Sequence, residues 1–410
     1  MNNMKKPRIR FKGFTDDWEQ RKLGDLMDVG SVKRVHQSDW RDSGVRFLRA
    51  RDVVADFNNE EPDDYLYIDQ KMYEEYSAQS GKVQQGDLLV TGVGTIGIPM
   101  LIKSEKPLYF KDGNIIWFKN KNAIDGQFFY YSFISKGIQD FIKESAGIGT
   151  VGTYTIDSGK KTPINLPTSI EEQKKIGAFL ESIDNVITLH QRKYEKLQII
   201  KKSMLENCFP KNGEKVPKIR FSGFTGDWEQ RKLSDITNVY DGVHQTPDYQ
   251  ESGIMFLSVE NIATLKSNKY ISQEAFERDY KNYPEKGDIL MTRIGDVGTP
   301  NVVETTEKVA FYVSLALLKP KNVDSYFLCN AICSPEFQRN LKNRTLVTAI
   351  PQKINKDEIG KVEFLMPQNT SEQKAIGAYF KNLDHLITLH QSELEKLQKI
   401  KKSLLERMFV

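Results

Sequence analysis

The chain has 410 residues, 39% of them hydrophobic, which is enough to bury a sizeable core and to form two or three domains. No long run of uncharged apolar residues occurs, and no hydrophobic region follows the basic N-terminus, so the sequence argues against a membrane protein and we expect a cytoplasmic one. The net charge of +4 permits a nucleic-acid partner without demanding it, and three cysteines are too few for a disulfide framework.

In chain order, the first notable segment is a motif that returns later. Residues 7–26, PRIRFKGFTDDWEQRKLGDL, reappear at 217–236 as PKIRFSGFTGDWEQRKLSDI, with 15 of 20 positions identical. A longer segment, residues 172–209, returns at 372–409 with 23 of 38 positions identical. The sequence therefore consists of two related halves, and such repetition predicts a duplicated architecture.

Each half has a centre that has diverged from its copy. Short β-forming runs broken by Gly and Pro, with short helical pieces between them, predict an α+β domain in each centre. We expect residues 1–168 and 217–368 to form two globular domains, each beginning with its copy of the repeated motif. Residues 210–216 should be a linker, and residues 169–209 and 369–410 should be long helices.

The two long helices should match each other. A capping box is expected at each start, from Ser169 to Glu172 and from Thr370 to Gln373, in which side chains satisfy free backbone N–H groups. Apolar residues spaced alternately four and three apart form a heptad stripe along each helix. A helix of about 38 residues, roughly 57 Å long, with one such stripe needs a partner. We therefore predict that the two helices pair antiparallel about a pseudo-two-fold axis. The predicted seam comprises Ile183, Ile187, His190, Tyr194, Leu197, Leu383, Ile387, His390, Leu394 and Leu397.

Two of these seam residues are histidines at equivalent positions. Polar residues in a seam are known to fix the register of paired helices, and we interpret His190 and His390 in this way. A metal site or a pH switch is the alternative.

A glycine pattern lies in the centre of each half. Gly92, Gly94 and Gly97 spell G-x-G-x-x-G after a predicted strand, as in dinucleotide-binding folds. However, Pro99 and β-forming residues follow, so no helix N-terminus is available to receive a phosphate. The second half has Arg293 in place of the first glycine, which indicates that this glycine is dispensable. We predict a strand-turn-strand element in which the last two glycines adopt positive φ.

Sequence motifs of catalysis are missing. The chain has no P-loop, no H-E-x-x-H segment and no Asn-Pro-Pro-aromatic segment of the kind that adenine methyltransferases use. Its five histidines lack ligand spacing, and Cys329 and Cys333 are interpreted as structural. We therefore predict no catalytic residue, no metal site and no cofactor in this chain.

Four elements recur in the same order in both halves. They include G-D-(apolar)₃-T-x-x-G-x-x-G, which begins at Gly86 and Gly287, and P-x-x-x-x-E-Q-x-x-I, which begins at Pro167 and Pro367. Together with the heptad helices they make the whole chain similar to the DNA specificity subunit of type I restriction-modification enzymes. The resemblance implies two target recognition domains, each reading one half of a split double-stranded DNA site, with the helices as a spacer.

The resemblance also implies partners. Two modification subunits would bind S-adenosylmethionine and methylate adenine, and restriction subunits would use ATP and Mg²⁺ to translocate and cut DNA. The alternative is a stand-alone sequence-specific DNA-binding protein that acts without methylase or nuclease partners.

Candidate DNA contacts lie in two segments of each domain by this resemblance: the loop that follows the Gly-Asp strand and the segment before the last strand. Loop residues with polar side chains serve both phosphate and base contacts. The candidates are Thr91, Thr95, Thr150, Thr153 and Tyr154 in the first domain, and Thr292, Arg293, Asp296, Arg344, Thr345, Gln352 and Lys353 in the second.

Two further groups of residues are candidates. Arg46, Arg49 and Arg51 alternate along one predicted strand face that could follow phosphates, with a solvated outer face as the alternative. Trp18 and Trp228, in the repeated motif, are expected to anchor each half on the helix end of the other half, with partner docking as the alternative.

Overall fold

The computed structural model describes residues 6–146, 152–211 and 213–410. The chain forms two compact units, one made of Met1–His190 with Glu393–Val410 and the other of Gln191–Ser392. Each unit therefore contains part of both long helices, α7 (Ile170–Asn207) and α13 (Thr370–Met408). None of the described helices is long and apolar enough to cross a membrane.

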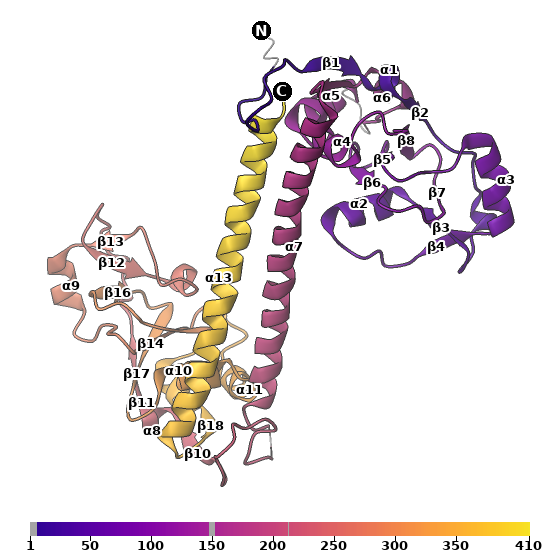
Figure 1. Ribbon diagram of the computed structural model, residues 1–410. Coiled ribbons are helices and arrows are strands. Elements are labelled where there is room, and N and C mark those ends of the chain that lie inside the picture. The colour runs from indigo at the N-terminus through magenta and orange to yellow at the C-terminus, as the bar shows by residue number, and fades with distance from the viewer. Residues whose placement is uncertain (1–5, 147–151, 212) are drawn as a thin grey trace. The chain divides into compact units, whose positions relative to one another are not determined.

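The first unit is a mixed α+β structure, as predicted (Figure 1). Its sheets have two, four and three strands, in the orders β1-β9, β2-β8-β5-β6 and β4-β3-β7. The strands are β1 (Glu19–Lys22), β2 (Asp28–Gly30), β3 (Val45–Leu48), β4 (Leu66–Ile68), β5 (Leu88–Thr91), β6 (Pro99–Leu101), β7 (Leu108–Phe110), β8 (Ile115–Lys119) and β9 (Pro163–Leu166). The helices before α7 are α1 (Leu23–Leu26), η1 (Gln37–Asp39), α2 (Ala50–Asn58), α3 (Gln70–Ser80), α4 (Gly126–Phe133), α5 (Lys136–Ser145) and α6 (Ile156–Lys161).

The second unit repeats this plan with the sheets β10-β18, β11-β17-β14-β15 and β13-β12-β16. Its strands are β10 (Glu229–Lys232), β11 (Thr237–Asp241), β12 (Ile254–Leu257), β13 (Tyr270–Ile271), β14 (Ile289–Thr292), β15 (Pro300–Val302), β16 (Val309–Phe311), β17 (Leu315–Pro320) and β18 (Glu363–Met366). Its helices before α13 are α8 (Leu233–Ile236), η2 (Val259–Asn261), α9 (Gln273–Asp279), α10 (Ser325–Cys333), α11 (Pro335–Asn343) and α12 (Lys356–Gly360).

The four-stranded sheet of each unit is buried on both faces. In β5, Leu88 and Val90 belong to one hydrophobic core while Leu89 belongs to another, and β8 alternates in the same way. Because side chains of a strand point alternately to opposite faces, a strand between two cores must be apolar at nearly every position. This explains the unbroken apolar runs LLV (88–90) and IIWF (115–118). The second unit divides β14 and β17 between its two cores in the same manner.

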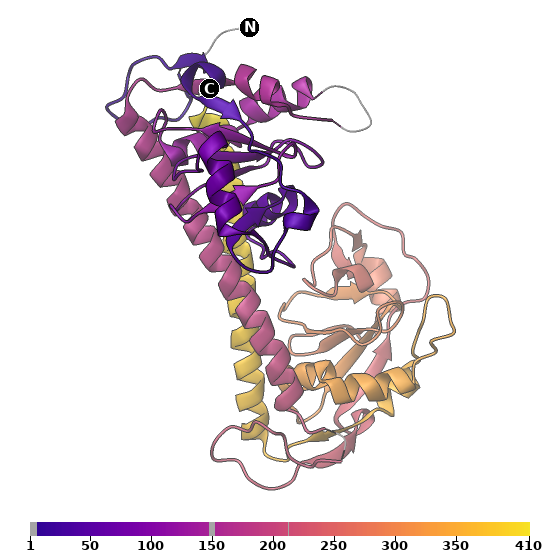
Figure 2. The same cartoon turned by 90° about the vertical axis from the view of Figure 1, so that its right-hand side faces the viewer.

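The two long helices run antiparallel within each unit (Figures 1 and 2). In the first unit Lys401 Nζ lies 2.6 Å from Asp184, and in the second Lys201 Nζ lies 2.5 Å from Asp384. The same lysine–aspartate pair thus joins the helices in both units, which confirms the predicted antiparallel arrangement. All ten residues of the predicted seam are buried or half-buried.

The capping boxes expected at the starts of the two long helices are not formed. Glu172 does not cap its own helix, because its carboxylate accepts hydrogen bonds from Arg10 Nε at 2.6 Å and Nη2 at 2.8 Å. In the second helix Asn369, rather than Thr370, accepts from a first-turn backbone N–H, that of Ser371, at 2.8 Å. The capping-box pattern was misleading because both reciprocal residues serve tertiary contacts: Glu172 pairs with Arg10, and Gln373 Oε1 accepts from Asp324 N at 3.2 Å.

The repeated tryptophans pack on a helix end that comes from the other half of the sequence. Trp18 lies edge-on to Phe409 with ring centres 6.3 Å apart, and Trp228 does the same to Phe209 at 6.1 Å. The anchoring role predicted for these aromatics is therefore confirmed.

Candidate nucleic-acid interface

One edge of the four-stranded sheet carries the candidate loops in each unit. Strands β2 and β5 are both antiparallel to β8, so they run parallel to each other and end at the same edge. The same holds for β11 and β14, which are both antiparallel to β17. The hairpin loop 92–98 follows β5, and its counterpart 293–299 follows β14. Both glycine patterns therefore sit in a strand-turn-strand element, as predicted.

The two shared glycines of each loop adopt the conformation that was expected of them. Gly94 and Gly97 have φ of 78° and 75°, and Gly295 and Gly298 have 82° and 101°. Side chains with a Cβ rarely adopt this region, which explains why both halves use glycine here.

The first glycine of the pattern is not dispensable in its own unit, contrary to the sequence interpretation. A Cβ on Gly92 would lie 2.7 Å from the backbone oxygen of Tyr154, a distance at which the backbone must shift. Gly92 is therefore required by a close approach of two chain segments rather than by its dihedral angles.

That close approach joins the two predicted DNA-contacting segments. Tyr154 N donates to Gly92 O at 2.9 Å, and Val93 forms a β-bridge with Thr153. In the second unit Gly295 N donates to Gln352 O at 2.9 Å, and Ile294 bridges Lys353. The structure thus brings together, in both units, two segments that are about 60 residues apart in the sequence.

The predicted residues divide by exposure. Thr95 and Thr153 in the first unit, and Asp296, Gln352 and Lys353 in the second, have exposed side chains on these paired segments. Arg344 and Thr345 are half-buried; Arg344 pairs with Glu358 at 3.2 Å, and Thr345 Oγ1 donates to Leu341 O at 2.9 Å. Thr150 lies outside the described residues.

Two predicted threonines are interior residues, which corrects their assignment. Thr91 and Thr292 are fully buried at the last position of their strands. Thr91 Oγ1 accepts from Ile98 N at 3.0 Å, and Thr292 Oγ1 accepts from Thr299 N at 2.9 Å. Each hydroxyl closes its hairpin loop and cannot reach DNA, which gives the repeated Thr in the Gly-Asp motif a structural role.

Tyr154 and Arg293 are also buried, so neither is a direct DNA contact. The Tyr154 hydroxyl is hydrogen-bonded to Thr162 Oγ1 at 2.6 Å, and burial raises the pKa of the phenol. Arg293 Nε donates to Ile354 O at 3.1 Å, and its Nη1 pairs with Asp241. Burial lowers the pKa of Arg293. Sequence reasoning failed here because polar residue types alone do not reveal which side of a loop they face.

The arginine series does not lie on one strand face. Strand β3 ends at Leu48, Arg49 occupies the N-cap of α2 and Arg51 is in that helix. Arg49 Nε donates to Asp52 at 3.0 Å, and Arg51 pairs with Asp64. Arg46 stacks on the Tyr65 ring with its guanidinium carbon 4.4 Å from the ring centre. Carboxylates already neutralise this cluster, so it is a poor candidate for following phosphates.

The second segment of the second unit has an exposed apolar tip. Leu346, Val347 and Ile350 are 47%, 56% and 101% exposed. Backbone bonds hold the tip, because Leu346 N donates to Lys353 O at 2.8 Å. Three lysines close to it in the sequence form no ion pair with any residue in the described ranges; they are Lys342, Lys353 and Lys356.

Sequence reasoning missed a third segment at this edge. Residues 35–38, VHQS, follow β2, and residues 243–246, VHQT, follow β11. Their His, Gln and Ser or Thr side chains are all exposed. The signal was available, because these four residues repeat in the diverged centres of the two halves.

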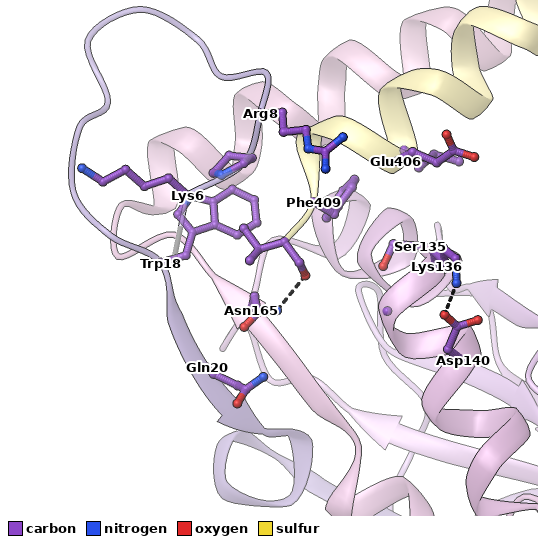
Figure 3. Close-up of a pocket in the computed structure, with 14 residues that line it drawn as sticks. Lys6, Arg8, Trp18, Gln20, Ser135, Lys136, Asp140, Asn165, Glu406 and Phe409 are labelled. Carbon is purple, nitrogen blue, oxygen red and sulfur yellow. Dashed lines mark hydrogen bonds and ion pairs between the residues drawn. The ribbon is translucent and has the colours of Figure 1, made fainter. Parts of the chain in front are cut away.

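A pocket lies in the first unit where Trp18 meets the end of α13 (Figure 3). It has a volume of about 520 Å³ and is lined by both apolar and charged residues. Lys136 pairs with Asp140 at its rim, and Asn165 Nδ2 donates to the backbone oxygen of Val410 at 2.7 Å. Ile9 N donates to Arg407 O at 3.0 Å and thereby joins the repeated motif to α13, so the pocket belongs to the structural junction.

The metal and thiol chemistry of the described residues is limited. Within the described ranges no group of three or more His, Cys, Asp or Glu side chains is placed to hold a metal ion. Burial raises the pKa of the Cys208 and Cys333 thiols to about 11, so both are protonated at neutral pH.

Comparison with known proteins identifies relatives of the whole chain. A family model described as the type I restriction modification DNA specificity domain matches residues 15–198 and again 225–399. The MjaVIII type I restriction enzyme specificity subunit of Methanocaldococcus jannaschii is 26% identical over 306 residues, covering 70% of each chain. A putative MjaX specificity subunit from the same organism is 24% identical and covers 95% of this chain and 92% of the relative.

The fold has a solved counterpart. The S subunit of a type I restriction-modification system from M. genitalium superimposes with a TM-score of 0.62 over 99% of both chains. At 15% sequence identity this likeness concerns the fold alone.

Proposed function

The chain belongs to the type I restriction-modification DNA specificity family, and from this premise we propose that it is the DNA-recognition subunit of a type I restriction-modification complex. Each unit reads one half of a bipartite double-stranded DNA target, and the paired helices set the gap between the halves. We assign residues 1–168 and 217–368 as target recognition domains, residues 169–209 and 369–410 as spacer helices, and residues 210–216 as the linker.

One observation carries the proposal. In each unit the hairpin loop and the segment bonded to it form a hydrogen-bonded platform at one sheet edge, and the two platforms present different side chains. The first platform exposes the side chains of Thr95 and Thr153, whereas the second exposes those of Asp296, Gln352 and Lys353. Base reading needs polar side chains held on a firm support, so duplicated platforms with different side chains fit two different half-sites.

The second platform has features that suit DNA in particular. Its exposed Leu346, Val347 and Ile350 can contact thymine methyl groups, which are the apolar feature of the major groove. The exposed Lys342 and Lys353, near this tip in the sequence, supply the positive charge that phosphate contacts require.

Catalysis belongs to partner chains in this proposal. Two modification subunits with S-adenosylmethionine methylate adenine, and restriction subunits with ATP and Mg²⁺ cleave DNA, all in the cytoplasm, while this chain has no catalytic residue or cofactor of its own. We propose the long helices as the surface that these partners contact. Phe179, Val186 and Leu189 are exposed on one face of α7, and Leu386 and Leu389 are exposed on α13. Apolar rows of this kind favour docking of a partner chain.

Mapping methylated adenines in the genome of cells that express the chain with its partner subunits tests the proposal. We expect one bipartite motif with a fixed gap, and no motif in cells without this chain. Co-purification should recover methyltransferase chains with it. A chain that binds its target tightly without them would instead be a stand-alone DNA-binding protein.

Exchange of residues 237–371 for the matching segment of a relative tests the division of labour. The exchange should change one half of the methylated motif and leave the other half and the gap as they were. A change in both halves would contradict the assignment of one half-site to each unit.

A further inference from the structure

The repeated Val-His-Gln-Ser/Thr segments at 35–38 and 243–246 carry exposed side chains whose repetition the packing of the fold does not explain. His36, Gln37, His244 and Gln245 have exposed side chains. The side chains of Gln37, His244 and Gln245 form no hydrogen bond with another residue that the structure describes, and the His36 side chain has only a local contact with the backbone of Asp39. A residue that is repeated for packing would be buried or bonded, so their repetition points to a ligand outside the unit.

Both segments are held firmly at their ends. Val35 is buried in a hydrophobic core, and Val243 O accepts from Val313 N at 2.9 Å. After each segment comes an aromatic residue that packs on an aromatic residue of the following strand, β3 or β12. Trp40 lies on Phe47 with ring centres 6.0 Å apart, and the equivalent Tyr249 lies on Phe256 at 5.6 Å. Equivalent aromatic contacts in both units therefore hold the exposed triad, which is His-Gln-Ser at 36–38 and His-Gln-Thr at 244–246.

The location of the segments connects them with the proposed reading platforms. They follow β2 and β11, which end at the same sheet edge as β5 and β14. In the second unit the connection is direct, because Asp241 at the end of β11 pairs with Arg293 at the start of the hairpin loop. DNA held on a platform would therefore run close to the exposed triad.

We propose that the His-Gln-Ser/Thr segments are a contact to the DNA phosphodiester backbone that both units share, and this rests on the proposed function. The two platforms differ and read different bases, whereas residues that are the same in both units must contact a part of DNA that does not depend on sequence. Imidazole and amide N–H groups and a hydroxyl are suitable donors to phosphate oxygens. The segments position each unit on the duplex, and the platforms select the bases.

The test uses the full chain in complex with its methyltransferase partners and measures affinity by fluorescence anisotropy. The probes are a duplex with the mapped target and duplexes in which one half-site is scrambled. The variants are His36→Ala/Gln37→Ala and His244→Ala/Gln245→Ala. Gln84→Ala/Gln85→Ala is the matched control, because these residues precede β5 and lie at the opposite sheet edge.

Each double variant should bind the target on the order of 3- to 10-fold more weakly, as expected for the loss of a few solvent-exposed hydrogen bonds from uncharged donors to phosphate. The loss should be equal on target and scrambled duplexes, so that the preference for the target is unchanged. The parent complex should bind a target with uncharged methylphosphonate linkages beside the half-site with a similarly reduced affinity. The same linkages should not reduce the affinity of the variant any further. The control variant should bind the target with the affinity of the parent complex, and all variants should keep the thermal unfolding midpoint of the parent.

Two results would overturn the proposal. One is an unchanged affinity of both variants; the other is a loss confined to the target duplex, which would make the glutamines base-reading residues. Failure of the proposed function looks different, because the parent complex itself would then show no preference for the target over scrambled DNA.

Discussion

The candidate DNA-contacting loops of the two units have the same backbone arrangement but differ at the first position of the glycine pattern. In the first unit Gly92 lets the backbone of Tyr154 come close, whereas in the second the longer Arg293 turns inward to Asp241 and Ile354 O. The difference teaches that some residues that differ between the halves make buried contacts within their own unit and do not face a ligand. A varied polar residue near a binding loop is therefore not evidence of a ligand contact until its exposure is known.

The Gly-Asp turns at the opposite edge show the same principle. Asp87 is buried and accepts from Trp117 Nε1 at 2.8 Å, whereas Asp288 accepts from Lys319 Nζ at 2.7 Å. Burial raises the pKa of Asp87. One carboxylate position is thus satisfied by a neutral donor in one unit and by a cation in the other.

The largest expected effect comes from the ion pair that both units keep. Arg10→Ala and Arg220→Ala each leave a buried glutamate, Glu172 or Glu372, without its arginine, which typically costs about 3–5 kcal/mol. The cost should be smaller for Arg220→Ala, because Trp228 Nε1 still donates to Glu372 at 3.3 Å. Urea unfolding gives the free energies. Arg21→Ala, which removes an exposed pair, is the control and should cost under about 1 kcal/mol.

The next effect concerns the position at which the edges differ. Arg293→Ala should destabilise the second unit by about 2–3 kcal/mol, because Asp241 and Ile354 O lose a charged donor. Asp241→Ala should cost less once Arg293 is already alanine, and a double-mutant cycle measures this coupling. If Arg293→Ala altered the methylated half-site without any loss of stability, Arg293 would be a base contact after all.

The reciprocal change in the first unit should act through the backbone. Gly92→Ala places a Cβ against Tyr154 O and should cost about 1–3 kcal/mol through strain. Gly30→Ala is the control, because a Cβ there meets no atom within 4 Å. Thermal unfolding of the two variants compares them; equal midpoints would show that the two segments separate at little cost.

The smallest effect concerns the repeated tryptophans. Trp228→Phe removes a hydrogen bond to Glu372, whereas Trp18 Nε1 is buried without a hydrogen-bond partner among the described residues. Both replacements leave a similar gap, so Trp228→Phe should cost about 1 kcal/mol more than Trp18→Phe. Urea unfolding measures the difference, and a larger loss for Trp18→Phe would contradict this account of the two junctions.

The sequence by itself determined the duplicated α+β architecture, the antiparallel helices and the positive φ of the shared glycines. These features follow from local rules and from repetition: a heptad stripe needs a partner helix, and Gly94 and Gly295 occupy a turn that disfavours a Cβ. Comparing the two halves also revealed which positions vary.

Only the tertiary structure decided which candidate side chains face outward. Thr91, Thr292, Tyr154 and Arg293 are polar loop-end residues that point into the unit. The Glu172 side chain accepts a hydrogen bond from Arg10, which is 162 positions away in the sequence, instead of capping its own helix. The physical reason is that burial and pairing depend on segments distant in sequence, such as the strand β8 and the segment 152–155, whose approach no local pattern records.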